Sequence, residues 1–378
     1  MMIKKPLKKF ENYRFMEIIG RGASADVYLT IDDKMNQLIA VKCMPKSKID
    51  KEHGETNLRR ELEILHKLNH KNIIEIKKYR ETKNNHYIFL EYCNGGDLET
   101  YNKKYISQNK HPLNEFYIQK IMQQFVPALE YMHKNQIIHR DIKLQNILLN
   151  FDTHPNVPNN GNLPPKLTFG QESLNKPFTI KIADLGYAKD LAKDKEGSTI
   201  LGSPMYMSPD IVEKYTDDDK DNKKYNTSVD LWSLGVITYE LLTGSAPFSG
   251  NSIIEVFKSI KKGVYSFPKT LKPSIEIISF LNGLLQYNPE KRLNWEQINS
   301  HPFLTKNPNE FNYIDLELIT ENEQDKIEMD SHKSDNLLWI FFKCKNLNMN
   351  IDKMNEKEVK KPEVKQMINK NKVKKIVK

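Results

Sequence analysis

The sequence predicts an α+β fold of two lobes, a small β-rich N-terminal lobe and a larger helical C-terminal lobe. Apolar and polar residues alternate from Tyr13 to Met44, with turn residues between the runs, which is typical of antiparallel strands. Helical periodicity takes over from Asn114. Because Asn94–Gly96 breaks the pattern between these two regions, we expect the lobes to meet near Glu91–Asp97.

The N-terminal lobe is predicted to contain three strands, a helix and a further strand. The three strands lie between Tyr13 and Met44 and turn at Gly20–Ala23 and Asp32–Asn36. A helix over Thr56–Asn69 follows, because leucines recur there at three- and four-residue spacing and form one apolar stripe. These leucines are Leu58, Leu62, Leu65 and Leu68. The last predicted strand of the lobe is His86–Tyr92.

The C-terminal lobe is predicted from apolar residues at helical spacing after Asn114. The expected core positions are Phe116, Ile121, Phe125, Leu129 and Met132. Two stretches interrupt the pattern: residues 150–178 are rich in Pro, Asn and Gly, and residues 216–224 contain four Asp. We interpret both stretches as surface insertions.

These patterns together predict one large domain with short flanking segments. A basic extension covers residues 1–10, the domain covers residues 11–304, and a polar, basic tail covers residues 305–378. Within the domain we expect the N-terminal lobe at 11–92 and the C-terminal lobe at 93–304.

The positive charge of the chain is concentrated in the tail. The net charge is +9, and residues 351–378 contain ten Lys against four Asp or Glu. We therefore do not expect a nucleic-acid partner. A solvated tail, peripheral attraction to an anionic membrane and attraction to an acidic partner all remain open. The apolar run Leu337–Phe342 in the tail could dock signalling partners or pack back onto the domain.

The apolar segments and the cysteines together predict the cellular location of the protein. Leu337–Phe342 is the longest strongly apolar run and is too short to span a bilayer. Met1–Phe10 is basic but lacks the apolar stretch of a secretory signal, so we expect a cytoplasmic protein. The scattered Cys43, Cys93 and Cys344 are expected to be reduced and to bind no metal.

A glycine-rich turn and a lysine indicate a phosphate-binding site. The segment Gly20–Ala25 has glycines at positions 20 and 22, and missing side chains let backbone N–H groups approach phosphate oxygens. An ordinary hairpin turn would also explain this segment. One strand later, Lys42 is placed to reach phosphates, and Glu61 on the predicted helix could hold it by an ion pair.

The decisive motif is Ile138–Asn146, which reads IHRDIKLQN and is followed by Asp184-Leu185-Gly186. This ordered set resembles the eukaryotic protein kinase family over roughly residues 10–304. The resemblance implies a bilobal protein kinase fold and an enzyme that transfers the γ-phosphoryl group of ATP to Ser or Thr hydroxyls of protein substrates. Magnesium ions are the implied cofactor.

The resemblance assigns a chemical role to each residue of the motif. Asp141 is expected to accept the proton of the acceptor hydroxyl, and Lys143, typical of Ser/Thr kinases, to neutralise the γ-phosphate. Asn146 and Asp184 would supply the hard oxygen ligands that Mg²⁺ prefers. His139 and Leu185 are expected to pack as part of the core.

The resemblance also places the nucleotide. Backbone around Gly20, Gly22 and Ala25 would cover the phosphates, above Lys42 and Glu61. An apolar slot is expected for the adenine, with polar contacts at one edge. Its members are the sandwiching Val27, Ala40 and Leu148, the gatekeeper Leu90, the hinge residues Glu91 and Cys93, and Asp97 for the ribose.

Residues 202–210 resemble the substrate-docking end of an activation segment. Asp210 stands where the family has a longer glutamate, so we expect its salt bridge to Arg292 to be longer or rearranged. Asp230 is expected to be buried and to hold the backbone of the catalytic loop. Arg140 could organise an activating phosphate, for which Thr199 is the first candidate site and Ser198 the second.

Within the superfamily, the hinge segment 90–98 and residues 202–207 look most like the autophagy-initiating Ser/Thr kinases. The resemblance leaves autophagy initiation and another cytosolic signalling pathway both open. Two rival functions also remain. A pseudokinase scaffold would lack phosphate or metal ligands, which this sequence retains, and a small-molecule kinase would not need the peptide-holding segment 202–210.

Overall fold

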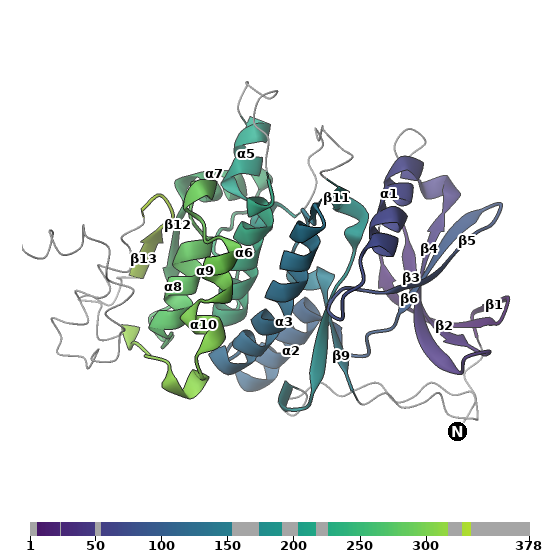
Figure 1. Ribbon diagram of the computed structural model, residues 1–378, viewed down its shortest axis with the longest axis horizontal. Coiled ribbons are helices and arrows are strands. Elements are labelled where there is room, and N and C mark those ends of the chain that lie inside the picture. The colour runs from purple at the N-terminus through teal and green to yellow at the C-terminus, as the bar shows by residue number, and fades with distance from the viewer. Residues whose placement is uncertain are drawn as a thin grey trace, which may run out of the picture.

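The computed structural model has two lobes, a β-sheet with one flanking helix and a larger helical body (Figure 1). It describes residues 6–22, 24–49, 54–152, 174–190, 203–216, 226–316 and 327–333. The predicted α+β fold of two lobes is therefore confirmed.

The N-terminal lobe is a six-stranded antiparallel sheet in the order β1-β2-β3-β4-β6-β5, with helix α1 packed against it. The elements are β1 Lys8–Phe10, β2 Tyr13–Arg21, β3 Asp26–Asp32, β4 Gln37–Pro45, α1 Gly54–Lys67, β5 Ile76–Glu81 and β6 Asn85–Glu91. The strands between Tyr13 and Met44, the following helix and the strand near His86 lie where the alternation and the leucine stripe predict them, apart from shifts of one or two residues at their ends.

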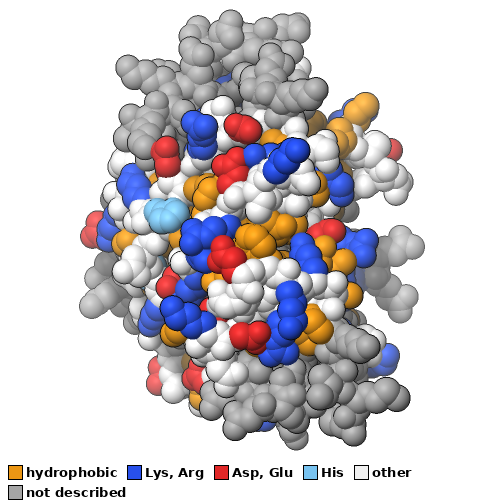
Figure 2. Space-filling model, turned by 90° about the vertical axis from the view of Figure 1, so that its right-hand side faces the viewer, with side chains coloured by type: hydrophobic (Ala, Val, Ile, Leu, Met, Phe, Trp, Pro, Cys, Tyr) orange, Lys and Arg blue, Asp and Glu red, His pale blue; other side chains and the backbone are white. Residues whose placement is uncertain are grey.

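The outer face of this sheet carries its own small aromatic core. Phe15, Tyr87 and Phe89 are buried there, together with the Cys43 thiol. Lys8 on β1 covers the cluster, with its Nζ 4.4 Å from the ring centroid of Phe15. A cation over an aromatic face is attracted by the ring quadrupole, so the N-terminal extension is held to the sheet by more than strand pairing. At this end of the molecule, basic side chains lie among hydrophobic ones (Figure 2).

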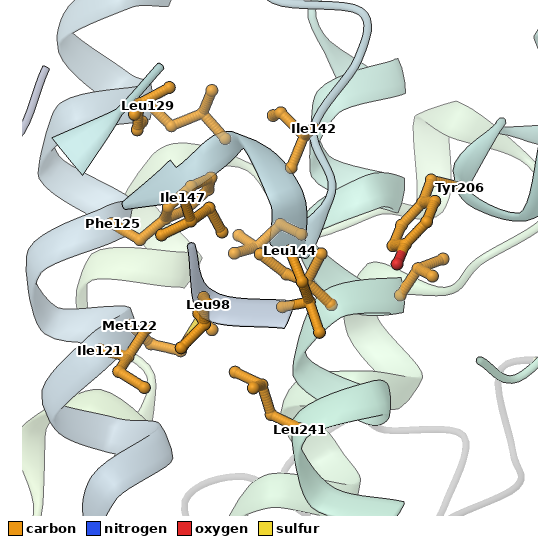
Figure 3. Close-up of a cluster of buried hydrophobic side chains, with 14 of the residues drawn as sticks. Leu98, Ile121, Met122, Phe125, Leu129, Ile142, Leu144, Ile147, Tyr206 and Leu241 are labelled. Atoms are coloured by element: carbon orange, nitrogen blue, oxygen red, sulfur yellow. The ribbon is translucent and has the colours of Figure 1, made fainter. Parts of the chain in front are cut away.

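The C-terminal lobe is a body of helices built around α6, which is buried on almost every side. Its helices are α2 Leu98–Asn109, α3 Glu115–Lys134, α5 Pro209–Thr216, α6 Ser228–Thr243, α7 Ile253–Lys262, α8 Ile275–Leu284, α9 Trp295–Asn299 and α10 Pro302–Thr305. Leu144 from the predicted catalytic loop fills the space between helices α2, α3 and α6, close to Leu98 and Leu241 (Figure 3). It is fully buried, so the loop is anchored in the core.

Short strands in the C-terminal lobe pair into small sheets of two or three strands. They are β7 Gly96–Asp97, β8 Ile137–Ile138, β9 Ile147–Phe151, β10 Phe178–Ile182, β11 Lys189–Asp190, β12 Val264–Phe267 and β13 Ile327–Asp330. β9 and β10 form a hairpin in which Phe151 pairs with Phe178. Both ends of the stretch predicted as the first insertion, 150–178, are thus strand; residues 153–173 lie outside the described part of the chain.

The predicted core of α3 is right at four positions and wrong at one. Ile121, Phe125, Leu129 and Met132 are fully buried, but 41% of Phe116 is exposed. Phe116 lies in the first turn of α3, and its ring is covered by Lys120 rather than by the core. The buried residues of that turn are Glu115, Tyr117 and Ile118, and Glu115 is bonded to the backbone of Ser274, so the inward face of the helix start excludes Phe116.

Residues 305–316, expected as the start of a polar tail, pack on the C-terminal lobe. Ile314 and Leu316 are buried, and the backbone of Asn312 and Ile314 bonds to the start of α8 and to Pro273. Glu276 accepts hydrogen bonds from the backbone and the side chain of Asn312, both at 3.0 Å. Asn312 is therefore a bonded polar residue of the domain, although its sequence context is typical of a solvated tail. The run Leu337–Phe342, Cys344 and the lysine-rich end lie outside the described residues.

No helix in the described ranges is both long enough and apolar enough to cross a lipid bilayer.

The buried Glu115 carboxyl is predicted to make stability depend on pH. Burial raises its pKa to about 7, although Ser274 N–H donates to it at 2.7 Å. A carboxyl whose pKa is raised by folding stabilises the protein below its unfolded pKa, near 4.5, and this contribution is lost as the pH rises through 7. Between these pH values, Glu115→Gln should gain stability relative to wild type by on the order of 3 kcal/mol.

Urea unfolding at a series of pH values measures this difference. Glu310→Gln, on the exposed surface, is the matched control and should follow the wild-type curve. Parallel pH curves for wild type and Glu115→Gln would show that the carboxyl does not titrate in this range.

Candidate active site

An ion pair connects the sheet to helix α1. Lys42 Nζ on β4 lies 2.7 Å from Glu61 Oε1 on α1 and 3.5 Å from Asp184 Oδ1, which follows β10. Burial acts to lower the pKa of Lys42, but the two carboxylates outweigh it and raise that pKa above its ordinary value. Burial likewise acts to raise the pKa of Asp184, and the nearby Lys42 lowers it below its usual range. Lys42 and the Asp184 carboxylate are therefore charged at neutral pH.

The inner face of the sheet brings together the residues expected around the nucleotide. Across the strand pairs, Val27 lies opposite Gly20 and Lys42, and Ala40 lies opposite Leu90. Directly opposed residues point to the same face of a sheet, so the side chains of Val27, Ala40, Lys42 and Leu90 share the face on which Glu61 meets Lys42, and Gly20 leaves that face open beside Val27. Gly22 N–H donates to the carbonyl of Ala25 at 2.8 Å and closes the turn; Ala23 lies outside the described residues.

The connection between the lobes supplies the other side of this site. Leu148 on β9 is paired with Asp97 on β7 and is partly exposed. Cys93 is buried in the same connection, and burial raises the pKa of its thiol. The Glu91 carboxylate lies 2.7 Å from Lys181 Nζ. Because its side chain is engaged in this ion pair, the backbone of Glu91 is the part that can face a nucleotide. Asp97 Oδ1 accepts from the N–H of Thr100 and caps α2.

The predicted catalytic residues form one cluster around the carboxylate of Asp141, a residue that is 3% exposed. Its Oδ2 lies 2.7 Å from Lys143 Nζ and 3.0 Å from Asn146 Nδ2. Its Oδ1 accepts from the backbone N–H of Ser203 at 3.0 Å, and Lys143 Nζ donates to Ser203 Oγ at 3.0 Å. These donors fix the orientation of the carboxylate. The bonds of Ser203 also join the start of the predicted docking segment to the predicted catalytic loop.

Asp230 on α6 fixes the backbone of this loop. Its carboxylate accepts from the N–H groups of His139 and Arg140, both at 2.9 Å, and lies 2.8 Å from His133 Nε2. Burial acts to raise the pKa of Asp230, but the hydrogen bond from His133 outweighs it and lowers that pKa. Arg140 has a φ of 66°, a left-handed conformation that these bonds stabilise. The role predicted for Asp230 is confirmed.

Asn146 and Asp184 lie next to each other across the β9–β10 hairpin, because the N–H of Ala183 donates to the carbonyl of Asn146 at 2.8 Å. The Asn146 amide nitrogen is bonded to Asp141, which leaves its oxygen as the atom that can bind a metal. Gly186 lies between the two carboxylates of the ion-pair site: a Cβ there would be 3.4 Å from Asp184 Oδ1 and 3.6 Å from Glu61 Oε2.

Within the described ranges, no group of three or more His, Cys, Asp and Glu side chains could hold a metal ion by itself. The two side-chain oxygens from Asn146 and Asp184 fit Mg²⁺, which takes few protein ligands and completes its shell with water and phosphate.

His139 and Leu185 are both buried, as predicted, and Leu185 belongs to the same hydrophobic core as Leu65 of α1. The salt bridge of Asp210 is not longer, as one of the two expectations had it. Arg292 binds the Asp210 carboxylate through both of its terminal nitrogens, at 2.9 and 3.2 Å, so the shorter side chain does not lengthen the salt bridge. Helix α5 begins at Pro209, and its position brings the carboxylate within reach.

Sequence reasoning missed two residues of the site, Ser203 and His133. Ser203 was visible only as part of the docking segment, and its bond to Asp141 depends on how that segment folds back. His133 looks like any polar residue on an amphipathic helix, and only its burial against Asp230 identifies it. The candidate phosphorylation sites Thr199 and Ser198 lie outside the described residues.

Comparison with known proteins agrees with this geometry. Residues 13–304 match the family model of the protein kinase domain. The chain is 34% identical to serine/threonine-protein kinase ULK1 of Homo sapiens over 79% of its length. It is 29% identical to serine/threonine-protein kinase ATG1 of Debaryomyces hansenii over 80%, and 31% identical to serine/threonine-protein kinase ULK3 of Mus musculus over 79%. The resemblance to autophagy-initiating kinases is confirmed by these similarities.

The chain covers 26% of the human relative, 35% of the yeast relative and 56% of the mouse relative. The similarity thus concerns one part of proteins that are longer than this chain.

The buried Asp230 carboxylate should be essential for stability. Asp230→Ala leaves His133 and two backbone N–H groups buried without their acceptor, so we expect the free energy of unfolding to fall by about 3–5 kcal/mol. Asp33→Ala, which removes an exposed carboxylate paired with Arg14, should change it by less than about 1 kcal/mol.

Urea unfolding followed by circular dichroism measures both variants. A loss for Asp230→Ala as small as that of Asp33→Ala would mean that water replaces the carboxylate without cost.

Proposed function

Because the chain belongs to the protein kinase family, we propose that it transfers the γ-phosphoryl group of ATP to serine or threonine hydroxyls of protein substrates. The observation that carries the proposal is the buried Asp141 carboxylate, oriented by Lys143, Asn146 and Ser203. Asp184 follows Ala183, which is bonded to Asn146 of this cluster, and Asp184 lies 3.5 Å from Lys42, so phosphate-binding and acceptor-binding groups surround one site.

The inner face of the sheet is suited to ATP. Val27, Ala40 and Leu90 offer apolar surface for the adenine, and Leu148 from the other lobe offers the opposite wall. Lys42 remains charged next to Glu61 and Asp184 and can bind phosphate oxygens. The closed turn at Gly22 and Ala25 presents backbone N–H groups without bulky side chains, as a cover over phosphates requires. Asp97 would contact the ribose.

Asn146 and Asp184 would hold Mg²⁺, which would neutralise charge on the phosphates when bound. The neighbouring Gly186 leaves room beside Asp184, because any larger residue would approach that carboxylate.

Asp141 is the group that would take the proton from the acceptor hydroxyl. Its two oxygens accept hydrogen bonds from different directions, so the carboxylate cannot rotate freely. Lys143 lies 2.7 Å from Asp141 and can also meet a phosphoryl oxygen. Positioning and charge stabilisation of this kind provide most of the catalysis in phosphoryl transfer.

A pseudokinase scaffold is less well supported. Each charged residue that would bind phosphate, metal or acceptor is present and has a partner suited to that role. A small-molecule kinase is disfavoured because Ser203 connects the docking segment directly to Asp141.

We further propose a role in the pathway of the related kinases, autophagy initiation, with cytoplasmic location and partners that bind through the tail. Support comes from the similarity to the ULK and ATG1 proteins. Activation by phosphorylation is supported by Arg140 beside Asp141, where its Nε also donates to the carbonyl of Tyr187 and touches the start of the activation segment.

Replacing Asp141 should abolish phosphoryl transfer. An amide cannot accept the hydroxyl proton, so Asp141→Asn should lower kcat for a generic Ser/Thr substrate by roughly 10²–10⁴-fold, with ATP binding retained. Radiolabelled phosphate incorporation with Mg²⁺ measures the rate, and Asp33→Asn is the matched control on the surface. Wild-type protein that binds ATP but transfers no phosphate, even after treatment with an upstream kinase, would favour the scaffold function.

Thr199→Ala should cause a partial loss of activity. One charge-assisted hydrogen bond to a phosphate is worth about 1.5 kcal/mol, which corresponds to a roughly tenfold lower rate. The same assay, with phosphorylated and dephosphorylated wild type for comparison, measures the effect. Loss in Ser198→Ala but not in Thr199→Ala would move the activating site to Ser198.

A further inference from the structure

A short segment of the C-terminal tail forms a strap on the far end of the C-terminal lobe (Figure 1). This tail strap, residues 327–333, adds strand β13 antiparallel to β12, with Met329 opposite Tyr265 and Glu328 opposite Ser266. Met329 is 1% exposed, whereas Glu328 points to solvent. The strap therefore buries Met329 beside Tyr265, whose ring also contacts those of Tyr239 and Phe267. Ser331 of the strap is buried as well.

The strap is bonded to the end of helix α7. Ser331 N–H donates to the carbonyl of Gly263 at 2.8 Å, and His332 Nε2 lies 3.2 Å from the carbonyl of Lys261. Gly263 ends the helix with a φ of 67°, and a Cβ there would lie 2.2 Å from Ser331 Oγ. Glycine is required at this position for two reasons, the left-handed backbone and the close approach of the strap.

The strap is also connected to helix α5. Tyr287 N–H donates to the carbonyl of Ser331 at 2.8 Å, and the His332 ring stacks on Tyr287 with centroids 4.1 Å apart. The Tyr287 hydroxyl donates to Glu213 of α5 at 2.7 Å. The same few residues of the tail thus contact α7 directly and α5 through one side chain.

Helices α5 and α7 border the place where a protein acceptor would lie. Both pack together, and α7 contacts the turn Pro204–Tyr206, which directly follows Ser203 on the Asp141 carboxylate. At the other end of α7, Ile253 and Ile254 are 54% and 63% exposed. A shift of α7 would therefore move an exposed apolar pair and the acceptor-side turn together.

We propose that the tail strap is a positioning element for the protein substrate: it holds α7 and α5, and through them the turn 204–206, in the arrangement that binds the acceptor. This inference rests on the proposed kinase function. None of the strap's described contacts reaches the nucleotide residues of the sheet, so the strap should affect the affinity for protein substrate and leave ATP binding unchanged.

The test uses full-length Met329→Asp, with Glu328→Ala as the matched control on the solvent side of the same strand. Dephosphorylated casein is the probe substrate. For Met329→Asp we expect the KM for casein to rise roughly 5-fold or more, as for a typical coupling between sites, with the KM for ATP and kcat within about twofold of wild type. Amide hydrogen exchange in α7 should become faster in the same variant. Glu328→Ala should match wild type in all these measurements.

Two further variants protect against a general folding defect. Met329→Leu keeps the buried volume and should restore the wild-type KM. His332→Ala removes the stack on Tyr287 and should raise the KM for casein by a smaller factor than Met329→Asp does.

The possible results separate the strap from the kinase function. An active wild type with an unchanged casein KM in Met329→Asp overturns the positioning role, whether or not α7 exchanges faster. A general loss of activity that also raises the KM for ATP overturns it too, because the effect would not be confined to the acceptor. No casein phosphorylation by wild type at all would overturn the proposed function itself, and the strap proposal with it.

Discussion

The geometry of the site depends on the buried carboxylate of Asp230. A buried charge costs several kcal/mol unless donors surround it, and here the donors are His133 and two consecutive backbone N–H groups. If the loop that carries Asp141 shifted, the buried Asp230 carboxylate would lose the two backbone N–H donors that stabilise its charge. Because Asp230 lies on α6, which is buried on almost every side, the loop is held by a helix in the core of the C-terminal lobe.

The two halves of the site come from different lobes, and backbone bonds set their relation. Ile182 N–H donates to the carbonyl of Asn72, and Ile74 N–H donates to the carbonyl of Ile182, both at 2.8 Å. These bonds join the loop before β5 to strand β10, two residues ahead of Asp184. The meeting of Asp184 with Lys42 therefore follows from strand-like pairing between the lobes as well as from their charges.

The sequence predicts well those features that have a local pattern. Alternation located the strands of the N-terminal lobe, and ordered motifs identified the charged residues that the fold brings together, such as Lys42 and Asp141. It failed where a long-range polar contact decides the outcome. Phe116 was placed in the core because spacing alone cannot show that Glu115 is bonded to Ser274. The packing of residues 306–316 was hidden for the same reason, since polar residues bonded to Glu276 look like solvated tail.

The N-terminal strand β1 has a consequence for how the chain can be divided. Residues 13–304 match the family model, yet β1 lies before them and pairs with β2 at the margin of the sheet. A fragment cut to the matched range would leave one edge of β2 unpaired and uncover the aromatic rings beneath Lys8. An exposed strand edge beside an apolar face is a template for pairing with another molecule, so such a fragment would be prone to aggregate through its β-sheet.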